Sequence, residues 1–60
     1  MYVIMRNDGK YVSRAGAEHS YCHSLNNARI YRERLTAVSH LCPENESVVS
    51  VDSILNAGRN

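Results

Sequence analysis

The sequence contains no Phe and no Trp, so a hydrophobic core must be built from aliphatic side chains and four tyrosines. Tyrosine carries a hydroxyl that needs a partner or water, which favours half-buried positions and interfaces. A chain of 60 residues also buries only about 60% of the surface that its unfolded form exposes. We therefore expect one small domain, residues 1–60, that gains stability by forming a homodimer.

Long apolar runs and an excess of charge of one sign are also missing. The chain has seven Lys and Arg residues and six Asp and Glu residues, which gives a net charge of +1. This balance is typical neither of nucleic-acid-binding proteins nor of acidic DNA mimics. No apolar run has the length needed to cross a bilayer, and residues 1–5 lack the basic start of a signal peptide. We expect a cytoplasmic protein with no membrane partner, and we do not expect nucleic acid as its main partner.

Cysteine is scarce, since only Cys22 and Cys42 are present. A reducing cytoplasm favours two small buried thiols over a disulfide between them. With His19 and His40 the two cysteines could supply four zinc ligands. The sequence has no CxxC motif, however, and the spacing of His and Cys matches no common zinc knuckle. We expect neither a metal nor any other cofactor.

Catalytic motifs are missing as well. The sequence contains no phosphate-binding loop, no dinucleotide fingerprint and no paired-acid arrangement. Cys22 precedes His23, but residues adjacent in sequence rarely present their side chains to each other. A chain of this length has little room for a pocket that excludes water. We expect that the protein is not an enzyme.

The elements that are present begin with two β-type runs, Tyr2–Arg6 and Lys10–Ser13. Asp8 and Gly9 lie between them, and Asp-Gly between strands is a strong hairpin signal because both turn residues must accept positive φ. A third run, Ser47–Val51, is rich in β-branched residues and is expected to pair with the hairpin.

The longest patterned segment is Ser24–Cys42, in which apolar side chains recur at steps of three and four residues. This spacing predicts one stripe of an α-helix. Ser24 is a suitable N-cap, and Pro43 ends the element. The stripe consists of Leu25, Ala28, Tyr31, Leu35, Val38, Leu41 and Cys42.

Ile30 lies off this stripe, so a second interpretation of the segment stays open. It divides the segment into a helical turn at Leu25–Ala28, an extended Arg29–Tyr31 and a helix from about Glu33. The two interpretations share a helix over Glu33–Leu41.

Together these elements predict an α+β fold, in which a small antiparallel sheet packs with one main α-helix. The sheet combines the N-terminal hairpin with the C-terminal strand. The ordered core is expected over about residues 2–51, and residues 52–60 are expected to form a tail in which Asp52 caps at most one helical turn. Such a layer leaves one sheet face and two strand edges open, where a second copy could dock.

The segment Arg14–His23 has the small and polar composition of a loop, with a turn at Gly16 and with Tyr21 as its anchor on the core. Long loops in small domains are often where binding occurs. A second candidate surface is the face that Arg29 and Arg32 share on the predicted helix. The candidate partner-binding residues are Arg14, Glu18, His19, Arg29 and Arg32.

Several stretches of residues 2–51 resemble small proteins encoded by phages and prophages. They are Tyr2-Val3-Ile4, Asp8-Gly9-Lys10-Tyr11-Val12-Ser13, Gly16, Ser20-Tyr21, Leu25-x-x-Ala28-Arg29-x-Tyr31, Cys42, Asn45-Glu46 and Val48-Val49-x-Val51. Among such proteins the chain is most similar to the Hachiman anti-defence family.

This resemblance implies an inhibitor that disables the Hachiman helicase–nuclease complex, a bacterial antiphage defence, by binding it without catalysis. The matching residues are mostly scaffold, so the resemblance assigns no individual contact residue. The alternative function is that of a small regulatory protein associated with nucleic acid, for which binding would weaken steeply with salt.

Overall fold

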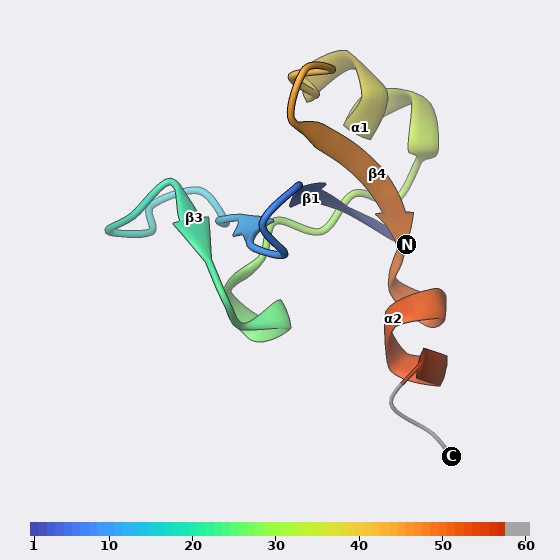
Figure 1. The fold of residues 1–60 in the computed structure, drawn as a ribbon, viewed down its shortest axis with the longest axis horizontal. Helices are drawn as coiled ribbons and strands as arrows, with labels where there is room; N and C mark the ends of the chain where they lie inside the picture. Colours follow the sequence, from blue (N-terminus) through green and yellow to red (C-terminus); the bar gives the residue numbers. More distant parts are fainter. Residues whose placement is uncertain (58–60) are drawn as a thin grey trace.

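The computed structural model describes residues 1–57 and has the expected α+β architecture (Figure 1). A four-stranded antiparallel sheet has the order β3-β2-β1-β4, with α1 over one face. The elements are β1 (Tyr2–Arg6), β2 (Tyr11–Val12), β3 (Tyr21–Cys22), the 3₁₀ turn η1 (Leu25–Asn27), α1 (Arg34–His40), β4 (Glu46–Ser50) and α2 (Val51–Ala57). The fold class predicted from the sequence is confirmed, with one strand and one helix more than expected.

The hairpin of β1 and β2 is present, but its turn differs from the expected one. Gly9 has a φ of +89°, whereas no residue other than glycine has positive φ among the described residues. The Gly9 N–H donates to Arg6 O at 2.9 Å, and the Arg6 N–H donates to Lys10 O at 2.7 Å. This is the pattern of a type I turn closed by a glycine bulge. The expectation that Asp8 also adopts positive φ is therefore wrong.

The longest pairing in the sheet is that of β1 with β4, which is antiparallel and runs from Tyr2 opposite Ser50 to Arg6 opposite Glu46. The predicted C-terminal strand is confirmed, displaced by one residue toward the N-terminus. Its β-branched valines suit the pleated and half-buried surface that this pairing creates.

The segment 24–42 is not one helix, and the second interpretation of it is the correct one. Ser24 caps η1 through its Oγ, which accepts the Asn26 N–H at 3.2 Å. The backbone then becomes extended at Ala28, and α1 begins only at Arg34 after an extended Glu33. The helix ends before Leu41, whose backbone is again extended, so two short helical pieces flank a stretch of strand-like backbone.

This strand-like stretch lies between the open ends of β1 and β2. Tyr31 and Tyr2 exchange two backbone hydrogen bonds of 2.8 Å, and the Arg29 N–H donates to Val12 O at 2.9 Å. Ala28 forms a bridge with Ser13 on the β2 side. These long-range bonds satisfy the backbone better than a continued helix would, and they bury the side chains of Ala28 and Tyr31.

The core has α1 on one face of the sheet, where Ile4, Tyr31 and Ala37 are buried against one another. Ala37 has no exposed surface, while Leu35 is 81% and Val38 is 44% exposed. The prediction that Leu35 and Val38 face the core is therefore wrong. The helix α1 contacts the core through Ala37, together with Leu41, which follows one helical turn later. The small Ala37 side chain lets the helix approach the sheet closely.

Two further elements depart from the expectations. Tyr21 and Cys22 form β3 inside the segment expected to be a loop, pairing with Val12 and Tyr11. The helix α2 continues directly from β4 and extends away from the sheet (Figure 1). Asp52 lies in the first turn of α2 and does not cap it, and residues 58–60 of the expected tail lie outside the described residues. No helix within residues 1–57 has the length and apolarity that a membrane span requires.

Candidate functional site

The five predicted contact residues fall on two separate surfaces. Arg14, Glu18 and His19 line a hollow of about 220 Å³ between β2, β3 and η1, which we call the loop hollow. Arg29 and Arg32 line an open depression in front of α1, which we call the arginine surface. The remaining residues of the loop hollow are Ser13, Ala17, Tyr21, Cys22 and Asn27. The remaining residues of the arginine surface are Ile30, Tyr31, Glu33 and Thr36.

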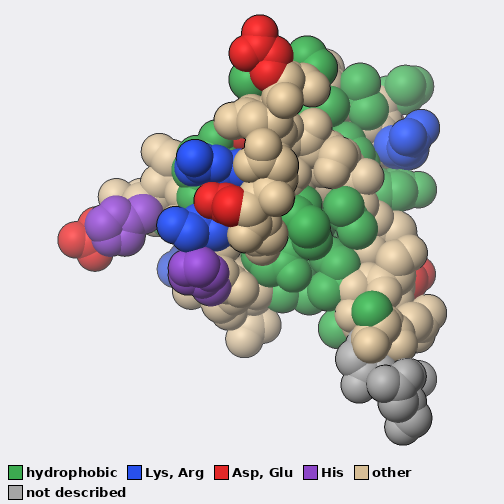
Figure 2. Space-filling view, in the orientation of Figure 1, with side chains coloured by type: hydrophobic (Ala, Val, Ile, Leu, Met, Phe, Trp, Pro, Cys, Tyr) green, Lys and Arg blue, Asp and Glu red, His purple; other side chains and the backbone are tan. Residues whose placement is uncertain are grey.

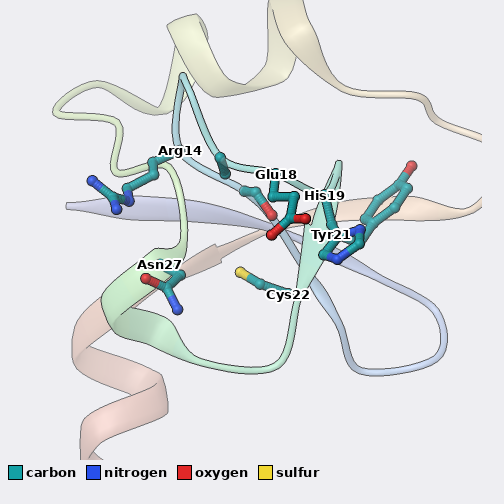
Figure 3. A pocket seen from close by; sticks show the side chains of 8 residues that line it. Arg14, Glu18, His19, Tyr21, Cys22 and Asn27 are labelled. Carbon is teal, nitrogen blue, oxygen red and sulfur yellow. The ribbon is translucent and has the colours of Figure 1, made fainter.

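The loop between β2 and β3 forms the loop hollow because backbone hydrogen bonds hold both of its ends. The Ser13 N–H donates to Ser20 O at 2.9 Å, and the Arg14 N–H donates to Asn27 O at 2.8 Å. Between these ties the chain reverses at Gly16, whose φ of +82° is favourable for glycine alone. In Figure 3 the Arg14 side chain extends away from the other labelled side chains. The described residues contain no ion pair between Arg14 and Glu18, so both charges are free to meet a partner.

Tyr21 anchors this loop to β4, the opposite edge strand, and not to the hydrophobic core as the sequence predicted. Its hydroxyl donates to Glu46 Oε2 at 2.5 Å, and its ring lies 4.7 Å from the Arg6 guanidinium carbon. The second oxygen of the same carboxylate, Glu46 Oε1, accepts the Cys42 N–H at 2.9 Å. One carboxylate therefore holds both the loop and the turn that follows α1.

This anchor raises the pKa of Tyr21 above its ordinary value. The cause is first the hydrogen bond to the Glu46 carboxylate, then burial and the negative charge of Glu46, while the Arg6 charge acts in the opposite direction. A raised pKa in the folded state means that the bond stabilises the fold below the ordinary tyrosine pKa of about 10. That stabilisation is lost as the pH rises through the raised pKa.

We expect the variant Glu46→Gln to bring the pKa of Tyr21 back toward its ordinary value, because the amide carries no negative charge. The ring carbon shifts of Tyr21, followed by NMR between neutral and alkaline pH, measure this change. In the unmodified chain the transition should lie above pH 10. An identical transition in the variant would show that Glu46 does not control the Tyr21 hydroxyl.

The arginine surface does not lie on a helix, contrary to the prediction. Arg29 lies in the extended stretch that is bonded to β1 and β2, and Arg32 lies in the bend between that stretch and α1. The Arg29 guanidinium carbon lies 5.2 Å from the centroid of the Tyr31 ring, a distance that allows a cation–π interaction. Ile30 points to solvent between the two arginines and is 43% exposed.

The residues predicted from the sequence lie on both surfaces, but other residues that line these surfaces were not predicted. Ile30 was the one position that disagreed with the helical stripe, and that disagreement was the available signal that it faces outward. Cys22 and Asn27 gave no such signal, because their approach to the loop depends on pairings between distant segments.

The soft metal ligands considered for zinc do not gather. Within residues 1–57 no three side chains of His, Cys, Asp or Glu have positions that could hold one metal ion. His40 packs near Tyr31, with 5.7 Å between the ring centroids. Cys22 and Cys42 are both free thiols, but Cys22 is half-buried and Cys42 exposed, so the expectation that both are buried is wrong. The exposed Cys42 follows from the early end of α1.

No protein-family model, curated protein or solved structure matches this chain.

Proposed function

We propose that this chain is a non-catalytic inhibitor, encoded by a phage or prophage, that acts by occupying the surface of a bacterial defence protein. The observation that carries this proposal is the arginine surface, where two arginines flank an exposed isoleucine. Arginines that lie next to exposed apolar side chains are often among the residues that contribute most to protein–protein binding energy.

The backbone of the arginine surface is fixed in advance of binding. The N–H groups of Arg29 and Tyr31 are both bonded to strands, at 2.9 and 2.8 Å. The Tyr31 ring lies beneath Arg29 and limits the conformations of its side chain. A surface that is already ordered loses less entropy on association, which favours tight binding by a small protein.

The loop hollow supplies a second region for contact. Arg14, Glu18 and His19 all line it, so it offers a mixture of charges and hydrogen-bonding groups. Charged groups at such positions contribute to the choice of partner and to the rate of association. The resemblance to the Hachiman anti-defence family supports the helicase–nuclease complex of that system as the target.

The alternative function, regulation through nucleic acid, has less support from the geometry. Proteins that bind single strands stack bases on exposed aromatic rings. The aromatic ring beside the arginines belongs to Tyr31, which is buried in the core. A salt-dependent shift of labelled DNA or RNA by the purified protein would favour the alternative over the inhibitor.

Plaque counts test the proposed function. Cells that carry the Hachiman system are infected with and without expression of this protein, and expression is expected to restore plaques. Cells with an unrelated defence system are the control, in which plaque counts should not change. Unchanged plaque counts on Hachiman cells, with the protein expressed and folded, would refute the proposed target.

A further inference from the structure

The outer edge of β4 is the longest unpaired strand edge among the described residues. β4 lies at one end of the sheet and pairs with β1 alone. The opposite end of the sheet is β3, which has only two residues. Strand edges that are protected from pairing often carry a lysine, a proline or a β-bulge. The strand β4 (Glu46–Ser50) contains no lysine and no proline, and its uninterrupted pairing with β1 shows no bulge.

The hydrogen bonds at the two ends of β4 show which of its backbone groups face outward. The Val51 N–H donates to Met1 O at 2.9 Å, and the Asn7 N–H donates to Asn45 O at 2.8 Å. In an antiparallel ladder the hydrogen-bonded positions alternate. Ser47 and Val49 therefore direct their backbone groups to β1.

The backbone groups of Glu46, Val48 and Ser50 consequently point away from β1. The Glu46 N–H is already bonded to Cys42 O at 3.0 Å. Ser50 precedes α2, and the carbonyl of a residue at this position accepts the first bond of the helix. Four groups remain on the free edge: Glu46 C=O, Val48 N–H, Val48 C=O and Ser50 N–H.

The helix α1 places apolar side chains above this same edge. His40 lies on the flank of α1 that faces Tyr31, and Tyr31 lies on the β2 side of β1. At about 100° per residue, Val38 falls on the opposite flank of the helix, with Leu35 further out on that flank. That flank is the β4 side, and Figure 2 shows hydrophobic side chains exposed around α1 at the top of the molecule.

We propose that two copies of this chain pair through the outer edges of β4, antiparallel, about a two-fold axis at Val48. In this register Val48 lies opposite Val48 of the second copy, and Glu46 lies opposite Ser50. The two valines exchange two hydrogen bonds, and each Ser50 N–H donates to the Glu46 carbonyl across the axis. All four free groups of each copy are satisfied, and no charge faces a like charge directly.

The same axis brings the two α1 helices together on one face of the joined sheet. α1 contacts both β1 and β4, so it lies above the boundary between them. With strands about 4.8 Å apart, the two helix axes then lie about 10 Å apart, which is a normal packing distance between helices. Leu35 and Val38 of each copy occupy the space between the helices. The arginine surface lies on the other flank of α1, so the dimer presents it twice.

Two measurements on the full chain test the pairing. Light scattering should give twice the mass of one chain at micromolar concentration, and amide hydrogen exchange should show protected Val48 and Ser50 N–H groups. In one chain alone these two amides face solvent and exchange rapidly. Their protection should therefore increase with protein concentration.

The variant Leu35→Glu should weaken the dimer at least about tenfold, because the symmetric interface loses two buried leucines. Thr36→Glu is its matched control, since it adds the same charge to the flank of α1 that borders the arginine surface. That variant should remain dimeric, and both variants should keep the circular dichroism of the unmodified fold. A chain that stays monomeric, a dimer with unprotected Val48 and Ser50 amides, or equal weakening by the two variants would each overturn the proposal.

Discussion

Reversal of charge at Arg29 and Arg32 is expected to reduce the inhibitory activity of this protein by at least about tenfold while leaving its fold intact. Arginines at the centre of an interface commonly contribute 2 kcal/mol or more, roughly a thirtyfold change in affinity for each. Both side chains border the depression that contains Ile30. The double variant Arg29→Glu/Arg32→Glu should therefore fail to restore plaques on cells that carry the Hachiman system.

The fold should survive this double substitution because neither charge is part of the core. Arg29 loses its contact with the Tyr31 ring, which costs about 0.5–1 kcal/mol at an exposed site. The backbone bonds of this stretch do not depend on the side chains. Circular dichroism of the purified variant measures whether the fold remains, so a loss of inhibition can be separated from a loss of structure.

A matched control exists on the same chain. The triple variant Lys10→Glu/Ser53→Glu/Asn56→Glu produces the same change in net charge, but none of its residues lines the arginine surface or the loop hollow. It should keep its inhibitory activity. If the double variant and the control lose activity equally, net charge explains the effect, and if the double variant stays fully active, the arginine surface is not the contact region.

The hairpin and β4 could be predicted from the sequence because their signals are local. Gly9 after Asp8 sets a turn whatever the rest of the chain does, and the valines of β4 favour a strand in any half-buried setting. The turn type was not predictable from Asp-Gly alone, because a two-residue turn and a type I turn with a glycine bulge use the same residues. The difference is one of strand register, which the long pairing of β1 with β4 helps to fix.

The division of the segment 24–42 could not be decided from its spacing. Ala28 and Tyr31 are three residues apart, which fits a helical stripe as well as an extended stretch buried at both ends. The choice depends on bonds to Tyr2 and Ser13, which lie far away in the sequence. β3 was missed for the same reason, since its two residues are held by β2 and by the Tyr21–Glu46 hydrogen bond.

The candidate contact residues lie on the surface of the structure, as loops and arginines do in most arrangements. Arg14, Glu18 and His19 were grouped by sequence position and remain grouped around one hollow. Arg29 and Arg32 border one depression although the helix assigned to them is absent. The apolar pattern, in contrast, did not predict burial in α1. Leu35 fits the helical spacing and is nevertheless exposed to solvent.

Truncation of Ile4 to alanine is expected to remove a large part of the free energy of unfolding of this protein. Ile4 is 1% exposed and packs in the core with Tyr31 and Ala37. Removal of a fully buried isoleucine side chain costs about 2–5 kcal/mol. A domain of this length has a total stability of roughly 3–9 kcal/mol, so the loss is comparable to the whole.

Urea denaturation followed by circular dichroism measures this loss, and all variants must be compared at one protein concentration because self-association shifts apparent stability. Ile30→Ala is the matched control, since it removes the same atoms from a side chain outside the core. It should change the free energy of unfolding by less than about 0.5 kcal/mol. The contrast between the two isoleucines follows from the extended stretch before α1, since a continuous helix would give Ile30 and Tyr31 different neighbours. Equal losses in the two variants would therefore contradict both the core centred on Ile4 and the outward position of Ile30.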